Sequence, residues 1–218
     1  VGLWSNDGRD WRSTGGSGWR TLIAAGYSDG KIRGPVATDW DDDPVSVDGS
    51  NQIRIRYTPS ENEPVRGIEI GVGYSASKTP NGKPLIATLY QGGKRLARAT
   101  LPFNAEQARV NRLTSVEGKD VRGWARNMQT NVQAAYDAQP ILQAGKEVQI
   151  VLSADSGSAH NFYLSQPIYG EELNVGSRCE KSSDSGRTWS RAGAKNSQRV
   201  GWVHLLQGGP DRMPARIV

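Results

Sequence analysis

The chain has 218 residues and a formal net charge of +5, so it is long enough for one large β-domain and only moderately basic. Its 26 glycines, 11 prolines and 36% hydrophobic residues favour short strands joined by turns, and no apolar run is long enough for membrane insertion. The arginines are scattered and accompany no nucleic-acid-binding motif, so we expect no nucleic-acid partner.

The N-terminal segment, residues 1–48, is rich in tryptophan and glycine. Trp19 and Trp40 lie in it without a clear strand pattern, so we expect some of its indoles to be exposed. An exposed indole can stack on the apolar face of a sugar while bonding the hydroxyls at its rim. The alternative is that these tryptophans close the open ends of a sandwich, since large aromatic side chains are often buried.

Five aspartates are concentrated where we expect a loop: Asp39, Asp41, Asp42, Asp43 and Asp48. Loop carboxylates are oxygen ligands that suit Ca²⁺, so these residues form a candidate calcium site. The spacing is not that of an EF-hand, because Pro44 follows directly, without the glycine turn and the distal glutamate. The alternative is a solvated acidic turn, and no other cofactor is expected.

Residues 49–170 alternate apolar and polar side chains, which indicates strands with one buried face. The predicted strands are 52–57, 67–72, 85–90, 94–101, 147–153 and 161–165. Their spacing is typical of an antiparallel β-sandwich and not of a parallel sheet with crossover helices. We therefore predict an all-β fold, with residues 1–218 in a single domain.

Residues 102–136 interrupt this strand pattern. Asn104 to Leu113 predicts a short helix, with Asn104 as its N-cap and Glu106 in its first turn. An insertion of this length between sandwich strands is either a packing flap or part of a binding rim.

Trp124 lies in a polar, basic part of the insertion, beside Arg122 and Arg126. This setting favours the binding rim. We expect the indole of Trp124, with Trp19 and Trp40, to stack on sugar rings, and the two arginines to engage acidic groups.

His160 and Tyr163 support an alternative in which the chain is an enzyme. A polysaccharide lyase uses an arginine, here Arg126, to neutralise the uronate, and a Tyr or His to abstract the C5 proton. Strand alternation, however, would put His160 and Tyr163 on opposite faces of their strand. No carboxylate pair with hydrolase-like spacing stands out either. We therefore expect a non-catalytic protein, with a lyase or glycoside hydrolase as the alternative.

The C-terminal segment, residues 171–218, contains the octapeptide Ser182–Trp189, which reads Ser-Ser-Asp-Ser-Gly-Arg-Thr-Trp. Ser182 and Asp184 can bond the amides of their own turn, and Gly186 supplies a positive φ. The final tryptophan can then pack back over the turn as a new strand begins.

This octapeptide resembles an Asp-box, the small β-hairpin of sialidases and related secreted proteins. In those families the motif braces a turn and faces away from the substrate, so the resemblance implies a glycan-related protein and no catalytic role. A sialidase propeller would need several repeats, and none occurs between positions 12 and 181.

Three further phrases are Arg56–Asn62 before an Ile-Glu-Ile strand, Leu89–Ala97, and Leu142–Leu152. Together they resemble a jelly-roll module that is appended to secreted glycan-processing enzymes and to phage or bacterial surface proteins. The resemblance covers residues 50–165. It implies a jelly-roll sandwich, here with a short helical insertion and a C-terminal Asp-box hairpin.

These features predict a carbohydrate-binding module of an extracellular or cell-surface or virion-surface protein, with a glycan or polysaccharide, in particular an acidic one, as its partner. A basic surface attracts such polymers through its long-range field. The other alternative is a receptor-binding or structural domain of a phage tail or surface fibre, for which a homo-oligomer is expected.

Overall fold

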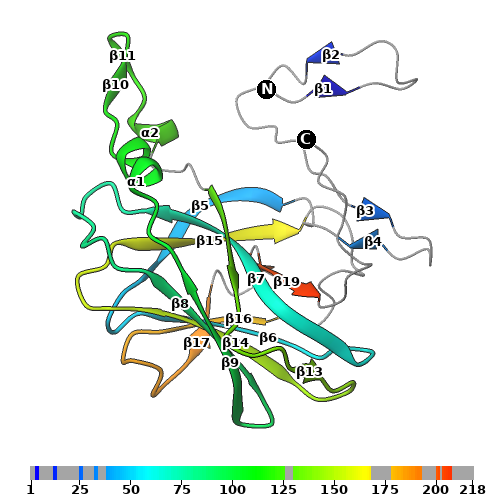
Figure 1. Ribbon diagram of the computed structural model, residues 1–218. Coiled ribbons are helices and arrows are strands. Elements are labelled where there is room, and N and C mark those ends of the chain that lie inside the picture. Colours follow the sequence, from blue (N-terminus) through cyan, green and yellow to red (C-terminus); the bar gives the residue numbers. More distant parts are fainter. Residues whose placement is uncertain are drawn as a thin grey trace.

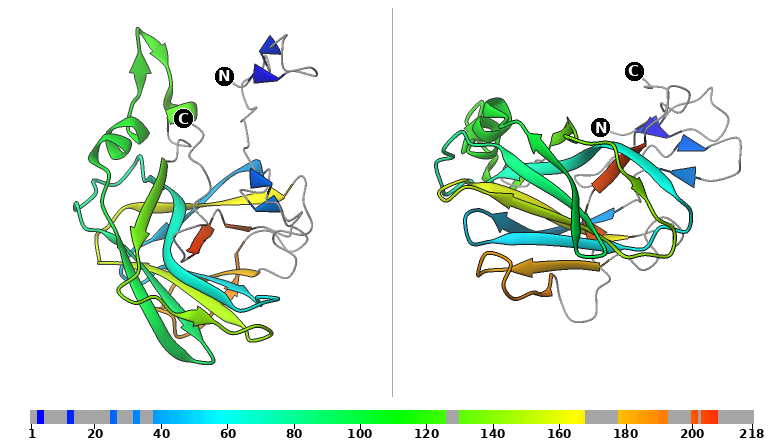
Figure 2. Two further views of the ribbon diagram at one scale, coloured as in Figure 1. Left: turned by 45° about the vertical axis from the view of Figure 1, so that its right-hand side comes forward. Right: turned by 60° about the horizontal axis from the view of Figure 1, so that its bottom comes forward.

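The computed structural model describes residues 3–4, 12–13, 25–26, 32–33, 38–125, 130–167, 178–192, 200–201 and 203–207. Only the backbone is described at residues 3–4, 12–13, 25–26, 32–33, 38–44, 123–124, 131, 163–167, 178, 200–201, 203–204 and 207. Two antiparallel sheets pack face to face as a β-sandwich, and the helices gather at one end of it (Figure 1, Figure 2). The all-β prediction is confirmed. No helix among the described residues is long and apolar enough to cross a membrane.

One sheet has six strands in the order β17-β16-β6-β14-β8-β9. They are β6 (Gln52–Tyr57), β8 (Leu85–Gln91), β9 (Lys94–Leu101), β14 (Val148–Ala154), β16 (Arg178–Ser182) and β17 (Ser190–Arg191). Strands β8 and β9, both predicted, form a hairpin, and Gly92 and Gly93 take the positive φ values of 60° and 76° that its tight turn requires.

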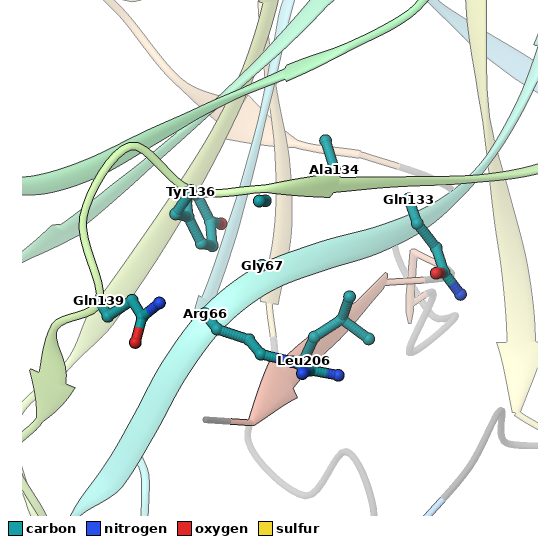
Figure 3. A pocket seen from close by; sticks show the side chains of 8 residues that line it. Arg66, Gly67, Gln133, Ala134, Tyr136, Gln139 and Leu206 are labelled. Carbon is teal, nitrogen blue, oxygen red and sulfur yellow. The ribbon is translucent and has the colours of Figure 1, made fainter. Parts of the chain in front are cut away.

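The second sheet has seven strands, with β7 at its centre. They are β5 (Thr38–Val47), β7 (Glu63–Tyr74), β12 (Thr130–Ala135), β13 (Ile141–Leu142), β15 (His160–Pro167), β18 (Val200–Gly201) and β19 (Val203–Gln207). One edge of β7 pairs with β12 and β13. The other edge pairs with β15 at Val72–Tyr74 and with β19 further along, which sets Leu206 opposite Gly67 (Figure 3).

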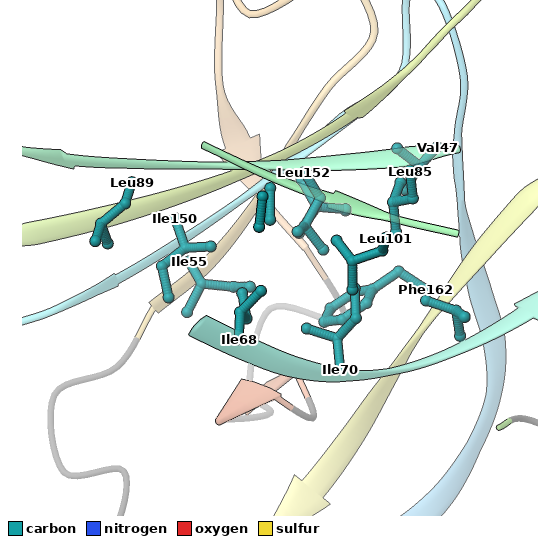
Figure 4. Close-up of a cluster of buried hydrophobic side chains, with 14 of the residues drawn as sticks. Val47, Ile55, Ile68, Ile70, Leu85, Leu89, Leu101, Ile150, Leu152 and Phe162 are labelled. Atoms are coloured by element: carbon teal, nitrogen blue, oxygen red, sulfur yellow. The ribbon is translucent and has the colours of Figure 1, made fainter. Parts of the chain in front are cut away.

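The core lies between the two sheets, where their inward-facing aliphatic side chains meet (Figure 4). Ile55 of β6 and Ile150 of β14 point toward Ile68 and Ile70 of β7, and Ile53 belongs to the same buried cluster. The pattern follows from strand alternation, because every second residue of β6, β8 and β14 is buried, or half-buried at Tyr57 and Ala154, and the residues between them lie on the outer face.

Two short helices close one end of the sandwich: α1 (Ala105–Asn111) and α2 (Arg122–Ala125). Asn104 caps α1 as predicted, since its side chain accepts a hydrogen bond from the amide of Gln107 at 2.9 Å. Buried Asn111 joins three elements by accepting from the amide of Tyr74 at 3.0 Å and donating to the carbonyl of Ala125 at 2.8 Å. The hairpin of β10 (Ser115–Val116) and β11 (Lys119–Asp120) projects from this end as an arm (Figure 1).

The two sheets extend beyond the predicted core of residues 49–170, because β5 precedes it and β16 to β19 follow it. The described parts of residues 1–37 form two separate two-stranded sheets. They are β1 (Leu3–Trp4) with β2 (Arg12–Ser13), and β3 (Ala25–Gly26) with β4 (Ile32–Arg33).

The prediction of an acidic loop at Asp39–Asp43 is wrong, because these residues belong to strand β5. Aspartate is depleted in strands, so composition favoured a loop, but pairing with β15 decides the backbone conformation. The register shifts here: Pro44 pairs with Tyr163 and Trp40 with Ser165, so the backbone of Asp41–Asp43 forms a bulge in the strand.

Candidate functional site

Arginines and aromatic residues coincide on the outer face of the six-stranded sheet. The register places one row of side chains across five neighbouring strands: Glu180, Arg54, Val151, Thr88 and Arg98. The next row contains Arg56, Gln149, Tyr90 and Arg95. Residues directly opposite each other share a face, so these rows form one surface that extends about 19 Å across the strands. We call this surface the arginine face.

Two of its arginines are held by carboxylates. The Glu180 carboxylate accepts a hydrogen bond from Nε of Arg54 at 2.7 Å and another from Nη2 of Arg56 at 2.8 Å. Arg56 also donates to Glu147 at 3.3 Å through Nη1. The Glu180 and Arg54 side chains are only 15% and 19% exposed, so this part of the face is a fixed polar network and not a set of free charges.

Trp189 adds an aromatic wall to this network. The guanidinium carbon of Arg54 lies 4.3 Å from the centre of the Trp189 ring, a distance at which a cation and an aromatic face attract each other. The Arg54 guanidinium thus contacts both the Trp189 indole and the Glu180 carboxylate. These contacts fix the half-buried Trp189 side chain at the border of the arginine face.

The opposite border of the face carries free positive charge. Arg95 and Arg98 on β9 are exposed, and no described carboxylate lies within ion-pair distance of either guanidinium. Tyr90 pairs in register with Arg95 and is half-buried beside it. The face therefore has a rigid border at Trp189 and a charged, accessible border at β9.

The turn of residues Ser182–Trp189 supports the rigid border. Asp184 accepts hydrogen bonds from the amide and the hydroxyl of Thr188 at 2.9 Å and 2.6 Å, and Ser182 accepts one from the amide of Gly186 at 2.9 Å. These bonds, led by the side-chain bond from Thr188, hold the pKa of Asp184 well below its ordinary value. Gly186 has a φ of 82°, and Trp189 packs against it. The predicted turn chemistry is confirmed.

Asp48, one of the predicted calcium ligands, is engaged within its own loop. Its Oδ1 accepts from the amide of Asn51 at 3.1 Å and from the amide of Ser50 at 3.2 Å, and Lys78 approaches its Oδ2 at 3.7 Å. Burial would raise the pKa of Asp48, but these amides and the ammonium hold it below its ordinary value. No group of three metal-binding side chains is found in the part of the chain that the structure describes.

The predicted rim is only partly visible. Arg122 lies on α2, exposed, and its guanidinium bonds the Asp120 carboxylate at 2.6 Å, which lowers the pKa of Asp120 to about 2. Trp124 is in the same helix, and its side chain is outside the described residues. So are Trp19, Arg126 and the side chain of Trp40. The described residues do not bring this predicted group together with the arginine face.

His160, the predicted catalytic base of the alternative enzyme, lies inside the end of the sandwich. Its side chain is 2% exposed and packs against the ring of Tyr74 with 5.2 Å between ring centres. Burial lowers the pKa of His160 to about 4. The backbone of Tyr163 lies three residues along the same strand, and its side chain is outside the described residues. In this position the imidazole has no access to a polymer.

Sequence reasoning missed the residues of the arginine face as a group. The alternation in β6 indicates that Arg54 and Arg56 point away from the core, and the same holds for Arg98 in β9. Their proximity depends on the pairing of β6 with β14 and of β14 with β8, which joins segments almost a hundred residues apart. No local pattern carries that information.

Comparison with known proteins adds no identification. A scan against protein-family models gives no match to the chain, and a search of curated proteins gives none either.

Proposed function

We propose that the protein is a non-catalytic carbohydrate-binding module of an extracellular protein, and that it holds acidic polysaccharide on the arginine face. The sandwich would be of the jelly-roll type, and the Ser182–Trp189 turn, with the hydrogen bonds and the positive φ described above, would be an Asp-box hairpin.

The observation that supports this proposal is the coincidence of arginines and aromatic rings on one sheet surface. Arg95 and Arg98 offer unpaired guanidinium groups, which suit carboxylates because their donors form a planar fork. Tyr90 offers a ring beside Arg95, and Trp189 offers one at the opposite border of the face, and such rings suit the apolar faces of sugars. An open sheet surface is also better suited to binding an extended polymer than to binding a small molecule.

The enzymatic alternative finds no support in the described site, because burial withdraws His160 from solvent. The rim formed by Trp124, Arg122 and Arg126, calcium binding and a homo-oligomer all stay predictions.

The first test is affinity electrophoresis in gels that contain polygalacturonate, a uronic-acid polymer, or dextran, an uncharged one. We expect the wild-type protein to be retarded by polygalacturonate alone. Replacing both free arginines, Arg95→Ala with Arg98→Ala, should weaken binding about tenfold, since each exposed charge contributes about 1 kcal/mol at most. Both side chains are exposed, so the fold should be unaffected.

The matched control is Arg112→Ala with Lys119→Ala, which removes two exposed cations from the helical end of the sandwich, neither of which has an ion pair within the described residues. It should leave retardation unchanged. If the wild-type protein is not retarded by the acidic polymer, or if the control variant loses as much affinity as the face variant, the proposed site is wrong.

A further inference from the structure

A pocket of about 310 Å³ lies on the outer surface of the seven-stranded sheet, opposite in the sandwich to the arginine face (Figure 3). Its floor is Gly67 of β7, between Ala135 on β12 and Leu206 on β19. A Cβ atom at position 67 would lie 2.6 Å from the carbonyl oxygen of Ala134 and 3.3 Å from a methyl group of Leu206. The close approach of the flanking strands therefore requires glycine, and the absent side chain leaves the floor open.

Arg66 enters the pocket because the sheet is irregular at this residue. Leu206 pairs with Gly67 and Gln207 with Val65, so Arg66 has no partner on β19 and forms a bulge. The Arg66 carbonyl accepts a hydrogen bond from the amide of Tyr136 at 2.9 Å. A bulge re-aims the side chain it carries, and here the Arg66 side chain runs from β7 toward Leu206 along the pocket (Figure 3).

Three side chains that can donate hydrogen bonds surround this floor, and they form no hydrogen bonds with each other. Arg66 is half-buried, and Gln133 and Gln139 are exposed. Within the described part of the chain, no hydrogen bond or ion pair involves the side chain of any of the three, whereas Arg54, Arg56, Arg109 and Arg122 all have carboxylate partners. A half-buried guanidinium has lost part of its hydration, so an unpaired one favours an anionic ligand.

We propose that this pocket binds a single carboxylate-bearing sugar unit, such as a hexuronate. The Arg66 guanidinium would take the carboxylate, and the amides of Gln133 and Gln139 would bond the ring hydroxyls. The exposed Ala135 and the half-buried Leu206 supply apolar lining against a ring face. The volume is at the lower end of the range of small-molecule sites, which fits one ring and not an extended chain.

The choice of a sugar acid within the wider class of small carboxylates rests on the proposed function, but the pocket itself does not. It lies on the other sheet and shares no residue with the arginine face. Loss of one site therefore leaves the other intact, and the two proposals can fail separately.

The test is titration calorimetry of the full chain with sodium D-glucuronate, D-glucose and acetate. Glucose keeps the ring without the carboxylate, and acetate keeps the carboxylate without the ring. We expect saturable binding of glucuronate at one site and at least tenfold weaker binding of the other two. Arg66→Gln should weaken glucuronate binding about tenfold or more, because it removes a charge-assisted pair.

A second variant, Gln133→Ala with Gln139→Ala, alters only exposed side chains and keeps the test valid if Arg66→Gln does not fold. It should weaken glucuronate binding several-fold. The face variant, Arg95→Ala with Arg98→Ala, should bind glucuronate like the wild-type protein. The proposal is overturned by absence of saturable glucuronate binding, by equal binding of acetate, or by glucuronate affinity that none of the pocket variants changes.

Discussion

At His160, the surroundings fix the protonation state of the side chain. The imidazole is 2% exposed, it packs against Tyr74, and neither ring nitrogen has a hydrogen-bond partner within the described structure. An unpaired imidazole in such a place is tolerated only when it is neutral, and burial lowers its pKa to about 4. His160 is thus a core side chain whose protonation at low pH destabilises the folded state.

This sensitivity gives a prediction for stability. The unfolded chain takes up the proton near pH 6.5 and the folded chain only near pH 4, so the folded state loses stability as the pH falls through this interval. The full difference corresponds to roughly 3 kcal/mol. Urea unfolding of the wild-type protein between pH 7 and pH 4 should show the loss, and His160→Leu should flatten the profile.

A comparison variant, His204→Gln, removes the other histidine of the chain and measures what that residue contributes to the profile. Parallel pH profiles for the wild-type protein and His160→Leu would show that acid lability arises elsewhere.

Among the elements, the Ser182–Trp189 turn depends most visibly on one glycine. Gly186 has a φ of 82°, and a Cβ atom there would lie 2.8 Å from the amide oxygen of Gln52. A side chain at this position would meet the penalty of the left-handed backbone and would also have to displace the flexible end of the Gln52 side chain. At Gly92, which has a φ of 60°, nothing lies within 4 Å of the same atom, so only the backbone penalty applies.

We therefore expect Gly186→Ala to destabilise the protein more than Gly92→Ala does. The backbone conformation alone costs about 1–2 kcal/mol, and the displacement of Gln52 adds to it in Gly186→Ala. Urea unfolding of both variants at neutral pH measures the difference. Equal losses in the two variants would show that Gln52 yields freely and that the turn is less tightly packed against β6 than the distances imply.

The elements differ in how well sequence predicts them. Strands β6, β8, β9 and β14 carry regular alternation, and α1 carries an asparagine cap, so local chemistry was enough for all of them. Strand β5 is rich in aspartate, and β12, Thr-Asn-Val-Gln-Ala-Ala, has few large apolar residues. Both are strands because of their partners, β15 and β7, and such long-range pairing leaves little local signal.

The candidate site, too, has parts that local sequence predicts and parts that depend on long-range strand pairing. The turn at Ser182–Trp189 was predictable because its hydrogen bonds join neighbours in sequence. The arginine face and the Gly67 pocket were not, because each is assembled by register across strands that are distant in sequence. A bulge such as the one at Arg66 depends on a one-residue difference between two paired strands, which no pattern within β7 reveals.

At the scale of the whole molecule, the net charge is +5, and several of the described arginines are paired with carboxylates. At the helical end, Arg109 pairs with Glu106 and Arg122 with Asp120, so these charges cancel locally. Within the sandwich, Arg54 and Arg56 are likewise paired. Among the described arginines of the arginine face, free positive charge is found at its β9 border, where an approaching polyanion would meet it.

Binding of polygalacturonate should consequently weaken as salt increases. Arg95 and Arg98 are exposed, and the distance over which such charges act falls from about 10 Å at 0.1 M salt to about 3 Å at 1 M. We expect a much lower affinity for the polymer at about 0.5 M than at about 0.05 M sodium chloride, and a shallower salt dependence for Arg95→Ala with Arg98→Ala. Glucuronate binding should change less, because Arg66 is half-buried and less screened. Calorimetry at several salt concentrations measures polymer binding by the wild-type protein, polymer binding by the face variant, and glucuronate binding. A salt-independent affinity for the polymer would argue against the arginine face.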